Sequence, residues 1–105
     1  MGTIRPAAVA GTFYPADPHR LREVVAGLLA AQAPAGVDVI PRLLIVPHAG
    51  YVYSGRTAGK LYGLLREDPP RRIILLAPNH RVSLVQVALS GAAAFATRHE
   101  LKIDD

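Results

Sequence analysis

The chain has 105 residues, of which 50% are hydrophobic and 19% charged, with Lys+Arg 12 against Asp+Glu 8 and a formal net charge of +4. This composition excludes a disordered tail, and the absence of Cys excludes a disulfide scaffold, a Cys-based zinc site and a thiol nucleophile within these residues. Because no apolar run reaches membrane-spanning length and no secretory signal is visible, we expect one cytoplasmic domain over residues 1–105 without membrane contact.

The basic charge does not indicate a nucleic-acid partner. Proteins that bind nucleic acids cluster Lys and Arg on one face or in runs. Here the only tight basic pair is Arg71-Arg72, and the other basic residues are scattered. We therefore expect a solvated, mildly basic surface and no nucleic-acid binding.

An irregular arm and then a helix are predicted for the first third of the chain. Residues 3–15 are rich in Pro, Gly and Ala and lack regular periodicity. Asp17-Pro18 is a favourable helix start, because Asp accepts from the free N–H groups of the first turn and Pro suits the first helical position. The apolar residues that follow at helical spacing are Leu21, Val24, Val25, Leu28 and Leu29. This helix is predicted to end near Gln32.

Two strands with a helix between them are predicted for the centre. The apolar runs at 43–46 and 73–77 are typical of strands buried on both faces, and each stops at a proline. Between them, Ser54 is the expected N-cap of a second helix, which residues 68–70 would end. The expected inner face of that helix comprises Ala58, Leu61, Tyr62 and Leu65.

The remaining residues add a third strand and two weaker signals. Residues 85–89 alternate apolar and wetter positions, which predicts a strand with one wet face. Residues 92–95 and 101–103 carry weaker signals. Because strand, helix and strand within a short stretch form a βαβ unit, the predicted class is α/β, with a mostly parallel sheet flanked by helices. Two helices cover such a sheet incompletely, so the domain is expected to be part of a larger one.

Two histidines follow the two predicted buried strands at similar positions. His48 comes after the first strand and His80 after the second, so both would lie at the carboxyl edge of a parallel sheet, where such folds place ligands. Two imidazoles begin a metal site: two His with a carboxylate suit non-haem Fe(II), and three ligands with a water suit zinc. A histidine at a strand end can also be a simple surface residue. His19, in the first turn of the first helix, is expected to be exposed and without a role.

Aromatic residues flank the first of these histidines. Tyr51 and Tyr53 lie in the loop after His48 and offer hydroxyls to a pocket. Alternatively, both residues only pack against their neighbours and line no pocket, and the same alternative applies to Phe13 and Tyr14 in the arm. No Walker motif and no nucleophile elbow is present, so no catalytic residue is assigned.

Three motifs in order resemble the Memo-like family, whose bacterial and archaeal members are called AmmeMemoRadiSam system protein B. They are the Gly-Thr-Phe-Tyr-Pro stretch within residues 4–15, the Pro-His-Ala-Gly-Tyr block within residues 46–55, and the Pro-Asn-His block at 76–80. The resemblance implies a fold similar to the class III extradiol dioxygenases, which use non-haem iron. It also implies that His48 and His80 are metal ligands and that Phe13 lines the same pocket.

The resemblance further implies iron or copper binding with redox activity, and a functional link to a radical-SAM protein. Members of the family are much longer, and their later Asp and Cys ligands lie beyond residue 105. The chain is therefore expected to be the N-terminal portion of a single Memo-like α/β domain, inactive by itself and prone to self-association. The alternative is a non-catalytic binding or scaffold protein in which Phe13, Tyr14, Tyr51 and Tyr53 contact a peptide or small ligand.

Overall fold

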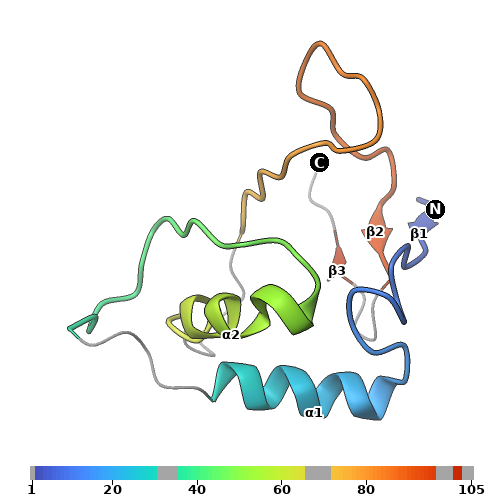
Figure 1. Cartoon of the computed structure of the whole chain (residues 1–105). Helices are drawn as coiled ribbons and strands as arrows, with labels where there is room; N and C mark the ends of the chain where they lie inside the picture. Colours follow the sequence, from blue (N-terminus) through green and yellow to red (C-terminus); the bar gives the residue numbers. More distant parts are fainter. Residues whose placement is uncertain (1, 31–35, 66–71, 97–100, 103–105) are drawn as a thin grey trace. The chain divides into compact units, whose positions relative to one another are not determined.

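A computed structural model describes residues 2–30, 36–65, 72–96 and 101–102 (Figure 1). The element order is β1 (Ile4–Arg5), α1 (Pro18–Leu29), α2 (Tyr51–Tyr62), β2 (Ala94–Phe95) and β3 (Leu101–Lys102). These elements fall into two compact units. The helical unit comprises the described part of residues 8–68, and the sheet unit comprises the described parts of residues 1–7 and 69–105.

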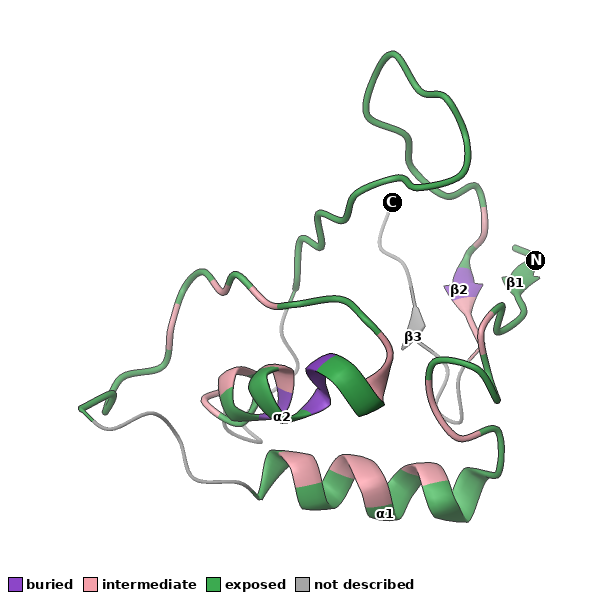
Figure 2. Cartoon of the chain, viewed as in Figure 1, coloured by how far each residue is buried: buried purple, intermediate pink, exposed green. Residues whose placement is uncertain are grey.

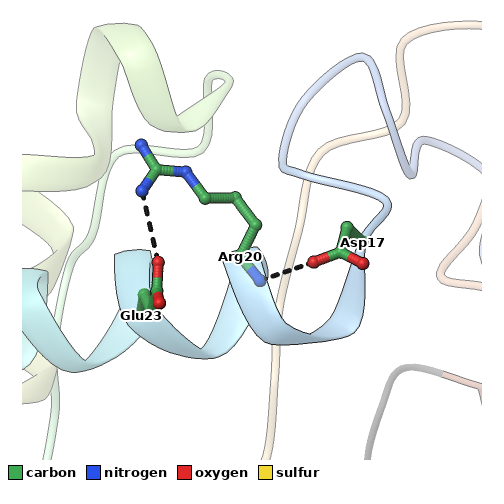
Figure 3. Close-up of polar contacts among 3 residues, drawn as sticks. All are labelled: Asp17, Arg20 and Glu23. Atoms are coloured by element: carbon green, nitrogen blue, oxygen red, sulfur yellow. Dashed lines mark hydrogen bonds and ion pairs between the residues drawn. The ribbon is translucent and has the colours of Figure 1, made fainter.

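Helix α1 begins where the sequence predicted. Asp17 is its N-cap, and its Oδ1 accepts a hydrogen bond of 2.8 Å from the backbone N–H of Arg20 (Figure 3). Pro18 occupies the first helical position, where its missing N–H costs nothing. An exposed ion pair of 3.3 Å joins Arg20 to Glu23 one turn further on. The start of α1 is therefore set by local chemistry.

The two helices of the helical unit pack closely through glycines of α2. Gly55 and Gly59 are buried, and a Cβ built on either would meet Leu28 of α1. The predicted face of α1 is half-buried at Leu21, Val24, Val25 and Leu28, whereas Leu29 is exposed. Helix α1 ends at Leu29, and the predicted end near Gln32 lies outside the described residues.

The predicted start of the second helix was wrong. Helix α2 begins at Tyr51 with Gly50 as N-cap, so Ser54 lies inside the helix and is buried there. Of the expected inner face, Ala58, Leu61 and Leu65 are half-buried, while Tyr62 is exposed. The deepest positions are instead Ser54, Gly55 and Gly59, because their small side chains let α1 approach. The predicted stop at 68–70 lies outside the described residues.

A small sheet forms the sheet unit. Strands β1 and β2 are parallel, with Ile4 opposite Ala94 and Arg5 opposite Phe95, and β3 pairs antiparallel with β2. Ala94 in β2 is buried, and Figure 2 colours part of this strand as buried. The guanidinium of Arg5 lies 5.1 Å from the centroid of the Phe95 ring, a cation–π contact. Strand β1 thus lies in the arm that was expected to be irregular, and β2 and β3 coincide with the two weaker signals at 92–95 and 101–103.

The apolar runs expected to form the sheet are not strands. Residues 43–46, 73–77 and 85–89 have no regular structure, and Ile45, Ile74 and Val85 are exposed by 86%, 85% and 98%. An apolar run needs a neighbouring strand for its backbone groups and a covering layer for its side chains. No such neighbour pairs with these runs among the described residues. The self-association expected from the sequence stays a prediction.

The described elements therefore make a mixed α/β fragment rather than the predicted βαβ core. Parallel pairing does occur, but it joins β1 to β2, with both helices in the intervening chain. Separately, the described part of the chain contains no helix that is long and apolar enough to cross a membrane.

Candidate functional site

An aromatic arm precedes α1 in the helical unit. The arm folds back on itself, because the backbone N–H groups of Thr12 and Phe13 both donate to the carbonyl oxygen of Val9, at 3.2 and 3.0 Å. Gly11 has a φ of 85°, a left-handed conformation that glycine adopts without steric cost, and its N–H donates to Tyr14 O at 2.7 Å. This tight turn fixes the backbone of the arm at Phe13 and Tyr14.

The arm docks on the beginning of α2. The N–H of Tyr51, the first residue of the helix, donates to the carbonyl oxygen of Phe13 at 2.8 Å. The rings of Tyr14 and Tyr51 are tilted by 39° with their centroids 5.7 Å apart, a favourable aromatic geometry. Helix α2 has no side-chain cap, and the arm carbonyl satisfies one of the free amides of its first turn.

Burial raises the pKa of the Tyr51 hydroxyl above its ordinary value of 10.0, and the neighbouring Tyr14 and Tyr62 raise it further. A partly desolvated phenol resists ionisation because the charged form loses hydration. At neutral pH Tyr51 is therefore a neutral hydrogen-bonding group in an aromatic environment.

The structure brings together three of the four predicted aromatic residues. Phe13, Tyr14 and Tyr51 meet where the arm joins α2. Tyr53 is on the first turn of α2 but is 87% exposed, and its ring lies near Gly50 rather than in the Tyr14–Tyr51 pair. Tyr14 and Tyr51 pack against each other, whereas Phe13 and Tyr53 are exposed, and a role of these four residues in a ligand pocket stays a prediction.

His48 lies just before this aromatic group along the chain. It is exposed, and the N-cap Gly50 follows two residues later. The intervening Ala49 is held by the buried Ser54, whose Oγ donates to Ala49 O at 2.9 Å. Sequence reasoning missed this role of Ser54, although serines inside helices often hydrogen-bond back to a carbonyl one turn earlier.

His80 belongs to the sheet unit and is also exposed. The residue before it, Asn79, closes a turn over the following residues. Asn79 Oδ1 accepts from the backbone N–H groups of Arg81 and Val82 at 3.3 and 3.2 Å, and Asn79 Nδ2 donates to Val82 O. Sequence reasoning used Asn79 only as part of a motif and missed this turn.

Imidazole nitrogens are suitable ligands for iron, copper and zinc, and the exposure of both histidines leaves them within reach of an ion. Within residues 2–30, 36–65, 72–96 and 101–102, no group of three or more His, Cys, Asp or Glu side chains is arranged to hold a metal. The two histidines thus fit a metal in donor type, and further ligands are needed to complete a centre of three or four.

The comparisons with known proteins agree on one family over most of the chain. A sequence model described as Memo-like protein matches residues 5–105. A MEMO1 family protein of Aquifex aeolicus is 44% identical over 77 residues, covering 73% of this chain and 27% of that protein. The protein MEMO1 of Danio rerio is 38% identical over 102 residues, covering 95% of this chain and 33% of that protein.

A MEMO1 family protein of Thermoplasma volcanium is 44% identical over 78 residues, covering 74% of this chain and 28% of that protein. The chain therefore spans between 27% and 33% of the length of these three relatives. No solved structure matches the chain.

Proposed function

The chain belongs to the Memo-like family, and from this membership and its two histidines we propose that it binds a redox-active metal ion through His48 and His80. Non-haem Fe(II) is the first candidate, with copper and zinc as alternatives. The observation that carries the proposal is that both imidazoles are exposed and each follows an apolar segment closed by proline.

Under this proposal each residue group has a defined task. His48 and His80 hold the ion through neutral imidazole nitrogens, and the remaining ligands come from a longer chain or from another subunit. A bound iron or copper ion would supply redox or dioxygenase-like chemistry, on a fold like that of the extradiol dioxygenases. The Phe13 and Tyr14 arm, docked on α2 beside the His48 segment, would present an apolar wall to a substrate and limit access of water.

Anaerobic calorimetric titration tests the metal site. Fe(II), Zn(II) and Cu(I) are each titrated into the wild-type chain and into the His48→Ala and His80→Ala variants. If both histidines serve one ion, each single substitution should remove the saturable phase, because one imidazole binds far more weakly than two. His19→Ala is the matched control, since it removes another exposed histidine on α1.

The outcomes separate the alternatives. Loss of binding in both variants with an unchanged control supports the shared ion. Two independent weak sites, each lost with its own histidine, would contradict it. Binding that survives both substitutions, or the absence of binding to the wild type, would refute the assignment of these ligands.

A second candidate function is binding of a peptide or small molecule without metal chemistry. The aromatic junction favours it, because Phe13 and Tyr53 are exposed beside the packed Tyr14–Tyr51 pair. Since the chain has no Trp and three of its four tyrosines belong to this region, tyrosine emission reports mainly on it when short peptides and aromatic fragments are screened. Ligand-induced changes that Phe13→Ala removes while metal affinity stays unchanged would favour this function over the first.

A further inference from the structure

Asn79, the residue before His80, makes three side-chain hydrogen bonds to the backbone that follows that histidine. Its Oδ1 accepts from Arg81 N at 3.3 Å and from Val82 N at 3.2 Å, and its Nδ2 donates to Val82 O. These bonds connect Asn79 to the backbone on the far side of His80. The side chain therefore closes a ring that contains the backbone of His80.

The chemistry of the asparagine side chain suits this turn. An amide carries a carbonyl oxygen with two acceptor positions and an NH₂ group with two donors. Asp would keep the acceptors but has no donor for Val82 O, and Ala would have neither. Asn and Asp side chains are favoured in such turns because they imitate a backbone hydrogen bond.

Packing contributes little to the conformation of this turn. Asn79, His80, Arg81 and Val82 are all exposed, and no strand or helix includes them. Where side chains are not buried, local hydrogen bonds decide which backbone conformation is populated. The hydrogen bonds of Asn79 therefore contribute directly to the direction in which the backbone presents His80.

We propose that Asn79 is a positioning residue that orders the backbone at His80 and so prepares its imidazole for metal binding. The metal-binding part of this inference rests on the proposed function. A ligand held in one orientation loses less conformational entropy when the ion binds. Groups that orient metal ligands typically change metal affinity by about 10- to 100-fold when they are removed.

The first measurement needs no metal. Amide hydrogen exchange at Arg81 and Val82 is followed by nuclear magnetic resonance in the wild type, Asn79→Ala and Asn79→Asp. We expect about fivefold faster exchange at both amides in Asn79→Ala, the change that corresponds to loss of one ordinary hydrogen bond. In Asn79→Asp, the remaining carboxylate oxygen should keep the exchange rates within about twofold of the wild type.

Ser90→Ala is the matched control. Ser90 Oγ accepts from Ala92 N at 3.2 Å, so this substitution removes a comparable turn bond elsewhere in the sheet unit. It should leave exchange at Arg81 and Val82 unchanged. The second measurement is the metal titration described above, in which Asn79→Ala should raise the dissociation constant about tenfold and Ser90→Ala should not.

Each outcome decides one proposal. Unchanged exchange at Arg81 and Val82 in Asn79→Ala overturns the inference, whatever the metal data are. Faster exchange with unchanged metal affinity refutes the positioning role. A wild-type chain that binds no metal refutes the proposed function and, with it, the positioning role toward a metal. The exchange rates still show whether Asn79 orders the backbone turn at His80.

Discussion

Gly59→Ala is expected to force the two helices of the helical unit apart. A Cβ at this position of α2 would lie 2.8 Å from the carbonyl carbon of Leu28 and 2.9 Å from its Cβ, and closer still to the carbonyl oxygen. Because the obstructing atoms belong largely to the backbone of α1, a side-chain rotation cannot relieve the contact. Helix α1 must move, and its packing against α2 must loosen.

The expected cost follows from two opposing effects. Overpacking a close contact costs about 1–3 kcal/mol, and backbone obstruction places Gly59 near the upper end. Replacing glycine by alanine inside a helix recovers about 1 kcal/mol of helix propensity. The net loss of unfolding free energy should therefore be about 2 kcal/mol, which lowers the melting temperature by about 8–16 °C in a domain of this size.

Gly27→Ala is the matched control for this prediction. Gly27 is inside α1, and a Cβ there would meet nothing within 4 Å. The same substitution should then stabilise the chain by about 1 kcal/mol. Urea and thermal unfolding followed by far-ultraviolet circular dichroism measure both variants. Equal stability of the two variants, or a Gly59→Ala variant more stable than the wild type, would refute the close packing of α1 on α2.

Two further predictions concern α1 and Tyr51. Asp17→Ala should cost about 1 kcal/mol of unfolding free energy because it removes the N-cap bond to Arg20. The exposed Glu23→Gln change should cost less than about 0.5 kcal/mol, and equal losses in urea unfolding would contradict the capping role. Because the folded pKa of Tyr51 is raised, the folded state holds this proton more tightly than the unfolded chain does. The contribution of Tyr51 to stability should therefore be fully present below pH 10.0 and be lost as the pH rises through the folded pKa. Tyr51→Phe should weaken that alkaline loss in unfolding curves recorded between pH 8 and pH 11, and an identical loss in the variant would argue against burial of this phenol.

Local sequence signals predicted the first helix well, because its start depends on neighbouring residues. Asp17 reaches an amide only three residues away, and Pro18 needs no partner at the first helical position. The start of α2 could not be read in the same way. Its first amide bonds to the carbonyl oxygen of Phe13, which lies far back in the chain, whereas the sequence predicted a local cap by Ser54.

In the candidate site, too, local features could be predicted from the sequence and long-range ones could not. The histidines were found from their position after apolar, proline-terminated segments, Tyr51 and Tyr53 from their proximity to His48 in the sequence, and Phe13 from the family resemblance. Whether the two imidazoles share one ion is a matter of long-range placement, which local patterns do not contain. The hydrogen bonds of Ser54 and Asn79 were missed because several conformations satisfy such side chains equally well.

The sequence by itself determined the α/β composition, the position of α1, the lack of Cys within these 105 residues and the two histidine motifs. These features depend on residue type and on neighbours within a few positions. Only the tertiary structure decided that Gly59 is buried against Leu28, that Phe13 serves the first amide of α2, and that β1 pairs with β2. It also left the apolar runs at 43–46 and 73–77 unpaired, because hydrophobic residues favour a strand but only a neighbouring chain segment can hydrogen-bond it into a sheet.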